Sequence, residues 1–152
     1  MLYYYSEHKR ARYVALMEDG LAAFTAVIQA ALAVSGTYSE RLHGLVNEHV
    51  SLLWRRPNLL RVVQRSQMAG DVPDLSWRER FQEPFGLLVA FFREASASGE
   101  CAEFDPEMAA LSLLALDTGF ARFQEPCGPR FEAEQVAAHI SRLLLAGFRR
   151  TA

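Results

Sequence analysis

The sequence has few cysteines, a single lysine, no excess of positive charge and no long apolar run. Cys101 and Cys127 are far apart and lack the spacing of a metal site, so a disulfide scaffold is excluded and free thiols in a reducing cytoplasm are expected. Lys9 is the only lysine, and a formal net charge of −2 excludes the broad basic face that nucleic-acid binding requires. No apolar run reaches the length of a membrane span, so we expect a cytoplasmic protein without a membrane partner.

What the sequence does contain is apolar residues at helical spacing along almost its whole length. The 152 residues are 51% hydrophobic, which is enough for one domain with a sizeable core. No stretch alternates between apolar and polar residues for long, which argues against strands. These features predict an all-α protein of six helices, and the absence of repeats or linkers predicts a single domain over residues 1–152.

Caps and breakers set the expected limits of the first helices. The first helix spans about 7–34 and stops at Ser35 and Gly36. Thr37 and Glu40 have capping-box spacing, which opens a second helix to about residue 55. Pro57 ends that helix and begins a short third one to about residue 67, followed by a loop at 70–75.

The same kinds of signal delimit the remaining helices. Ser76 and Glu79 repeat the capping-box spacing and open a fourth helix to about residue 98. Pro84 lies inside that helix and predicts either a kink or a break into two helices. Asp105 followed by Pro106 predicts the start of a fifth helix to about residue 124, and the sixth spans about 131–149.

The expected fifth helix is apolar around most of its circumference, which predicts that two surfaces cover it. We expect one surface to be the chain's own core and the other a second copy of the chain. The predicted dimer interface on the last two helices comprises Leu113, Leu116, Asp117, Phe120, Phe123, Val136, His139, Ile140, Leu143 and Leu144. The alternative is a central helix in a monomeric bundle.

The two ends of the sequence and the order of helices resemble a known family. Residues 2–11 read Leu-Tyr-Tyr-Tyr-Ser-Glu-His-Lys-Arg-Ala, and residues 140–148 read Ile-Ser-Arg-Leu-Leu-Leu-Ala-Gly-Phe. With a long first helix, core helices and two closing helices, they resemble TetR-family transcriptional regulators. The resemblance implies a six-helix TetR-like C-terminal ligand-binding domain, whose last two helices form a four-helix-bundle dimer interface.

The resemblance also assigns a role to the beginning of the chain. It places residues 1–6 at the end of a DNA-recognition helix, although Ser6, His8 and Arg12 depart from the family pattern. The implied remnant of a DNA-phosphate contact comprises Tyr3, Tyr4, Tyr5 and Lys9. The alternative for the tyrosines is a frayed apolar end. The family's helix-turn-helix domain would precede this point, so we expect DNA to be bound only through an upstream domain, or not at all.

In the family, the helices between the first and the last enclose a small-molecule pocket, and suitable apolar and aromatic residues are present here. The predicted pocket comprises Phe24, Ile28, Leu45, His49, Leu53, Arg65, Met68, Trp77, Phe81 and Phe85. Such a lining suits a small hydrophobic or aromatic effector. The alternative is a filled core, because aromatic residues at steps of three and four are also typical of packed interiors.

Two polar residues lie on apolar stripes and need partners. His49 is either a polar anchor for a ligand or a core histidine that a carbonyl or carboxylate satisfies. Asp117 is expected to pair with His139 or Arg142 across the dimer, or with Arg122 nearby. For Arg65 the alternative is simple solvent exposure.

Signals of catalysis and of cofactors are absent from the sequence. His43 and His49 fall on different sides of a helix and make no metal pair, and no phosphate loop or nucleophile motif is present. We therefore expect no enzyme, no metal and no cofactor. The predicted function is the effector-sensing and dimerisation domain of a TetR-like transcriptional repressor. The alternative is a stand-alone ligand-binding or partner-sequestering helical dimer that never binds DNA.

Overall fold

The computed structural model describes residues 2–59, 61, 77–127 and 130–148. Five helices lie within these ranges, and no strand does. They are α1 (Leu2–Ala33), α2 (Tyr38–Arg55), α4 (Trp77–Ser98), α5 (Pro106–Cys127) and α6 (Ala133–Gly147). The prediction of an all-α protein is confirmed.

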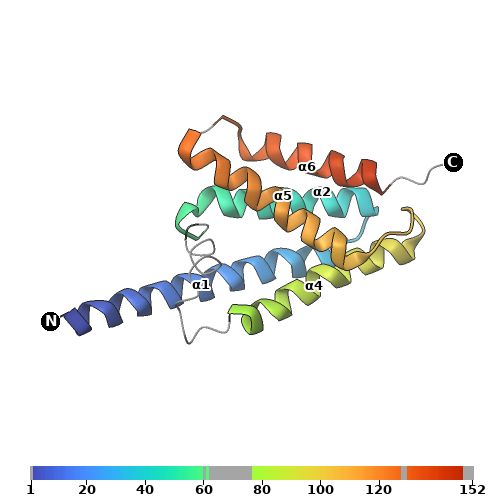
Figure 1. Cartoon of the computed structure of the whole chain (residues 1–152). Coiled ribbons are helices and arrows are strands. Elements are labelled where there is room, and N and C mark those ends of the chain that lie inside the picture. The colour runs from blue at the N-terminus through green and yellow to red at the C-terminus, as the bar shows by residue number, and fades with distance from the viewer. Residues whose placement is uncertain (1, 60, 62–76, 128–129, 149–152) are drawn as a thin grey trace.

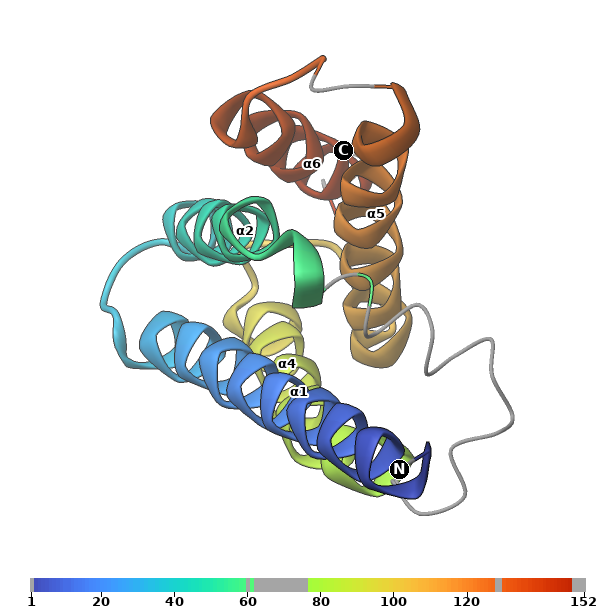
Figure 2. The same cartoon turned by 90° about the vertical axis from the view of Figure 1, so that its left-hand side faces the viewer.

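The helices pack as a bundle in which α1 extends furthest from the rest. Helices α1 and α4 lie side by side, and α2 packs most extensively on α6 (Figures 1 and 2). Helix α5 contacts α4, α2 and α6, so it joins the two parts of the bundle. The N-terminal part of α1 projects beyond the other helices (Figure 1).

Local capping interactions explain where α2 and α5 begin. The Thr37 hydroxyl accepts a hydrogen bond from the Glu40 backbone N–H at 3.3 Å, and the Glu40 carboxylate accepts one from the Thr37 N–H at 2.9 Å. The predicted capping box is therefore confirmed. At α5, the Asp105 carboxylate accepts hydrogen bonds from the N–H groups of Glu107 and Met108, both at 2.9 Å, which confirms this predicted start.

Several predicted boundaries were wrong. Helix α1 begins at Leu2 and not near residue 7, because no glycine or proline interrupts the sequence there. Helix α4 continues through Pro84 without a break, and this proline is buried. Helices α5 and α6 end at Cys127 and Gly147.

Residues 57–59 form a helical turn at the start of the predicted third helix. The rest of that helix, the predicted 70–75 loop and the Ser76 cap lie outside the described residues.

One segment corrects the expectation about membranes. Residues Ala11–Ala33 of α1 are long and apolar enough, by length and composition, to cross a membrane. In the bundle this segment packs on α2 and α4. It also carries ion pairs, from Glu18 to Arg80 of α4 and from Asp19 to Arg56. A core helix of a soluble protein has the same composition and the same kind of contacts.

The main core lies between the helices and draws residues from all five of them. Its largest fully buried side chains include Phe91 and Phe92 of α4 and Ile28 of α1. At one end, the Phe104 and Phe148 rings stack with their centroids 4.1 Å apart, and the Ala102 N–H donates to the Phe148 carbonyl at 2.8 Å. These contacts tie the end of α6 to the segment before α5, so the core positions both closing helices.

Candidate functional site

A row of aromatic rings from three helices lies in the predicted pocket region. The Phe24 ring of α1 is tilted against the His49 imidazole of α2, with centroids 4.5 Å apart. Phe81 of α4 stacks on the other members of the row, 6.1 Å from Phe24 and 5.9 Å from Phe85. Phe24 and His49 are buried, whereas Phe81 and Phe85 are half-buried. We call Phe24, His49, Phe81 and Phe85 the aromatic row.

A buried polar pair joins the aromatic row to α5. The His49 side chain is in contact with the Asp117 carboxylate, through Nδ1 and Oδ2. His49 is 5% exposed and Asp117 is 0% exposed. The other carboxylate oxygen of Asp117 accepts a hydrogen bond from the Thr118 backbone N–H at 2.7 Å. His49 is thus a core histidine held by a carboxylate, and Asp117 pairs within its own chain and not with His139, Arg142 or Arg122.

The remaining predicted pocket residues fall into three groups. Ile28 and Leu45 are buried in the same core cluster as Phe24. Leu53 belongs to a separate small cluster with Ala121, against which Trp54 packs. Trp77 opens α4, but its side chain is not described, and Arg65 and Met68 lie outside the described residues.

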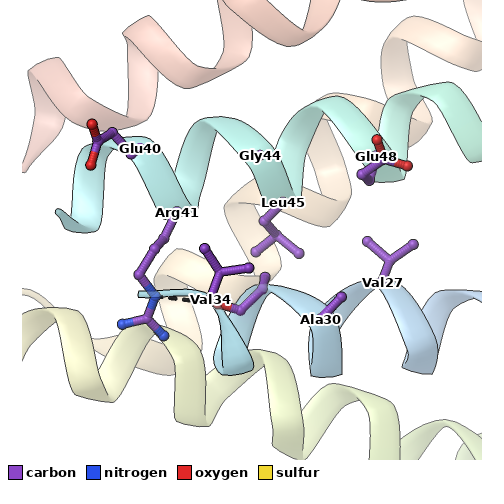
Figure 3. A pocket seen from close by; sticks show the side chains of 9 residues that line it. Val27, Ala30, Val34, Glu40, Arg41, Gly44, Leu45 and Glu48 are labelled. Carbon is purple, nitrogen blue, oxygen red and sulfur yellow. Dashed lines mark hydrogen bonds between the residues drawn. The ribbon is translucent and has the colours of Figure 1, made fainter. Parts of the chain in front are cut away.

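A cavity is present in a groove between α1 and α2 (Figure 3). It measures about 160 Å³, whereas small-molecule pockets usually measure about 300–1,000 Å³. Of the predicted pocket residues only Leu45 lines it. The other lining residues are Val27, Ala30, Ala31, Val34, Glu40, Arg41, Gly44 and Glu48. Its size and lining separate this groove from the aromatic row.

The last two helices divide the predicted interface residues between two faces. Five of them point into the chain's own core, which corrects their assignment to a dimer interface: Leu113, Asp117, Val136, Ile140 and Leu144. The other five are exposed or half-buried: Leu116, Phe120, Phe123, His139 and Leu143. The core needs one face of each amphipathic helix, so only the opposite face is available to a partner.

The outer face of α5 is unusually apolar. Phe123 is 73% exposed, Met108 is 64% exposed and Leu111 is 48% exposed, all on the side of the helix away from the core. The Phe120 ring meets the His139 ring of α6 edge to face, with centroids 5.8 Å apart. Met108, Leu111 and Phe123 of α5, with His139 and Leu143 of α6, are called the outer face below. One side of α5 is therefore covered by the chain's own core and the other side is available to a partner, as the composition of the helix predicts.

The predicted remnant of a DNA contact lies on the projecting part of α1. Tyr3, Tyr4 and Tyr5 are within the helix, but their side chains are not described. Lys9 is exposed on the same helix.

No metal site and no reactive thiol is found among the side chains that the structure describes. Across 2–59, 61, 77–127 and 130–148, no three His, Cys, Asp or Glu side chains lie close enough to hold a metal ion. Cys101 is a buried free thiol, and burial raises its pKa, which disfavours the reactive thiolate.

The structure is an all-helical bundle with a protruding first helix, an interior aromatic row and an apolar outer face on its closing helices. Its class is that of the C-terminal domains of TetR-like transcriptional regulators, as a family match shows. The family "Tetracyclin repressor-like, C-terminal domain" matches residues 35–148, and the chain belongs to this family. No curated protein matches the chain in sequence.

Solved structures show the same fold. A TetR/AcrR-family transcriptional regulator from Thermobifida fusca YX-ER1 is 28% identical, with a TM-score of 0.68 over 98% of this chain and 79% of that one. The TetR-family regulator PfmR from Thermus thermophilus is 22% identical, with a TM-score of 0.79 over 98% of this chain and 81% of that one. A Rhodococcus sp. RHA1 protein of unknown function is 22% identical, with a TM-score of 0.77 over 93% and 73% of the respective chains.

The main feature that sequence reasoning missed is the pairing of His49 with Asp117. Each residue carried its own signal, because both interrupt an apolar stripe. A pair of such interruptions on two helices of one bundle could have suggested a mutual contact. Met108 and Leu111 were also missed as members of the outer face, although the all-round apolar character of α5 includes them.

Proposed function

We propose that the chain is the effector-sensing and dimerisation domain of a TetR-like repressor. A small hydrophobic or aromatic effector would bind beside the aromatic row, and two copies would associate through the outer face. The observation that carries this proposal is the separation of the two surfaces on α5. One side of α5 reaches the aromatic row through Asp117 and His49, while the other presents exposed apolar residues.

The route from the effector to DNA would run along α1. Phe24 of α1 belongs to the aromatic row, and Phe81 follows directly after Arg80, which pairs with Glu18 of α1. A ligand that separates Phe24 from Phe81 would therefore change how α1 rests on α4. A DNA-reading domain joined before α1 would then move, because a repressor dimer needs its two recognition helices about 34–36 Å apart.

Two consequences concern DNA. We expect residues 1–152 alone to give no sequence-specific shift of DNA in a gel, because their net charge is −2. With a reading domain attached, we expect binding to a palindromic operator and release by the effector. A sequence-specific shift by residues 1–152 would contradict this assignment. The stand-alone ligand-binding dimer would then remain, and ligand binding at the proposed effector site tests it.

Fluorescence of a neutral apolar probe, N-phenylnaphthylamine, tests the effector site. We expect saturable binding that weakens about three- to tenfold in Phe81→Ala and in Phe85→Ala, which each lose an aromatic contact. The control is Gly44→Leu, which fills the groove between α1 and α2 and has no atom within 4 Å of its new Cβ. Binding that is absent, or that Gly44→Leu weakens instead, would refute the site at the aromatic row.

A further inference from the structure

His49 is fixed on one side and unpartnered on the other. Its Nδ1 contacts Asp117 Oδ2, and neither atom has another polar partner in the described part of the chain. Asp117 Oδ1 is held by the Thr118 N–H at 2.7 Å. The carboxylate is thus fully engaged, while no described residue hydrogen-bonds the His49 Nε2. Among the residues that the structure describes, one hydrogen-bonding position of a buried imidazole therefore has no protein partner.

The contact with Asp117 determines what the Nε2 can do. An ionised carboxylate only accepts hydrogen bonds, so the proton of a neutral imidazole resides on Nδ1. The Nε2 then carries a lone pair and is a hydrogen-bond acceptor. A ligand group that binds to it must donate a hydrogen bond, as a hydroxyl does.

The surroundings of His49 restrict the rest of such a ligand. Phe24 lies 4.5 Å from the imidazole, and Phe81 and Phe85 continue the row. Besides His49 and Asp117, the buried polar side chains among the described residues include Ser141, whose hydroxyl lies 3.3 Å from His43 Nδ1, and Tyr38. The row therefore offers aromatic faces and a single polar acceptor.

We propose that Asp117 holds His49 as the polar anchor of the effector site, and that the effector is a neutral aromatic molecule with a hydroxyl group, a phenol. This inference rests on the proposed function and specifies its ligand. A ligand carboxylate would bring a second negative charge next to the buried Asp117, which costs desolvation and repulsion. A ligand that carries only an acceptor would face the Nε2 lone pair.

Three probes of similar shape test the anchor: β-naphthol, which donates a hydrogen bond, acetylnaphthalene, which only accepts one, and naphthalene, which does neither. Their affinities are measured by displacement of N-phenylnaphthylamine at about pH 8. We expect β-naphthol to bind about tenfold more tightly than the other two, as one additional neutral hydrogen bond allows.

Asp117→Asn gives the sharpest variant. The carbonyl oxygen of the introduced amide would keep the Thr118 N–H, which turns the amide NH₂ toward His49 Nδ1. An amide donor requires the Nδ1 lone pair, so the imidazole proton moves to Nε2. The variant should then prefer acetylnaphthalene over β-naphthol, a reversal that a merely structural role of Asp117 would not produce.

Two further variants keep the test valid if single changes disturb folding. His49→Phe combined with Asp117→Leu removes both polar partners and leaves neither buried and unpaired. It should still bind naphthalene but should not distinguish β-naphthol from it. The control His43→Gln changes an exposed histidine of the same helix and should retain the full preference.

The outcomes separate this inference from the proposed function. Equal affinities for the three probes in the unchanged chain, or a preference for acetylnaphthalene, overturn the anchor and leave the effector site standing. The same holds if Asp117→Asn, folded by circular dichroism, keeps the preference for β-naphthol. If none of the probes displaces or binds, both the anchor and the effector site are refuted.

Discussion

A single pair of side chains, His49 and Asp117, links the aromatic row to α5. Both are buried, and each would be costly to bury without the other, because an uncompensated charge or polar group in an interior is strongly destabilising. Their contact therefore holds α2 and α5 in one relative position. The His49 ring also contacts Phe24 of the aromatic row, so we expect ligand binding at the row to be coupled to the packing of α5.

Another residue, Gly20, sets how closely the segment after α2 approaches α1. A Cβ at Gly20 would collide with the buried Leu59 side chain. We expect Gly20→Ala to lower the free energy of unfolding by about 1–3 kcal/mol, because overpacking outweighs the better helix propensity of alanine. Urea unfolding at equilibrium measures the change.

The matched control for Gly20 is Gly44→Ala in α2. A Cβ there has no atom within 4 Å, so this variant should be stabilised, by up to about 1 kcal/mol. If Gly20→Ala gains stability in the same way, then Gly20 and Leu59 are not in close contact in solution.

At the scale of the element, the capping box of α2 gives the stability a dependence on pH. The Thr37 N–H and then the Thr37 hydroxyl donate hydrogen bonds to the Glu40 carboxylate, and these bonds lower the pKa of Glu40. A lowered pKa in the folded state means that this carboxylate stabilises the fold above its unfolded pKa. The contribution is lost as the pH falls through the folded pKa.

Glu40→Gln keeps the shape of this side chain but removes its charge. We expect the unchanged chain to have a higher Tm than Glu40→Gln at about pH 7, and the difference to disappear in strong acid, below about pH 4. Thr37→Ala is the comparison, because the loss of its hydroxyl acceptor persists at both pH values. A Tm difference for Glu40→Gln that persists in acid would contradict the assignment to the carboxylate charge.

The elements were predictable where their signals are local. The Thr37 cap is read from Thr37 and Glu40, the Asp105 cap is read from Asp105 followed by Pro106, and both are formed. Pro84 was ambiguous, because a missing hydrogen bond can be offset by packing along the rest of α4. The partner of Asp117 could not be found from helical spacing, since the choice between its own core and a second chain depends on how α2 and α5 cross.

The same limit applies to the site as a whole. Phe24, His49, Phe81 and Phe85 were predicted and do lie together, because stripes on neighbouring helices of a bundle converge on its interior. The stripe of α2 continues to Leu53, which nevertheless packs in another cluster with Ala121. Helical periodicity identifies an inward face, but not which part of the interior each residue reaches.

At the scale of the whole molecule, the outer face decides whether the chain exists as a dimer. Leu111 and Phe123 are exposed on the side of α5 away from the core, and exposed large apolar side chains favour association. We expect size-exclusion chromatography with light scattering to give twice the chain mass of 17.1 kDa. Leu111→Glu combined with Phe123→Glu should give the mass of one chain, because paired copies would bury like charges without partners.

The control for this change is Val34→Glu, which adds a carboxylate at a site 56% exposed at the end of α1, beside the groove between α1 and α2. It should remain a dimer with unchanged helical content. A single-chain mass for the unchanged protein would refute dimerisation, and a dimer that survives both outer-face substitutions would place the interface elsewhere. If only the outer-face variant dissociates, the side of α5 opposite Asp117 is the dimer surface, and α5 alone separates the effector region from the partner chain.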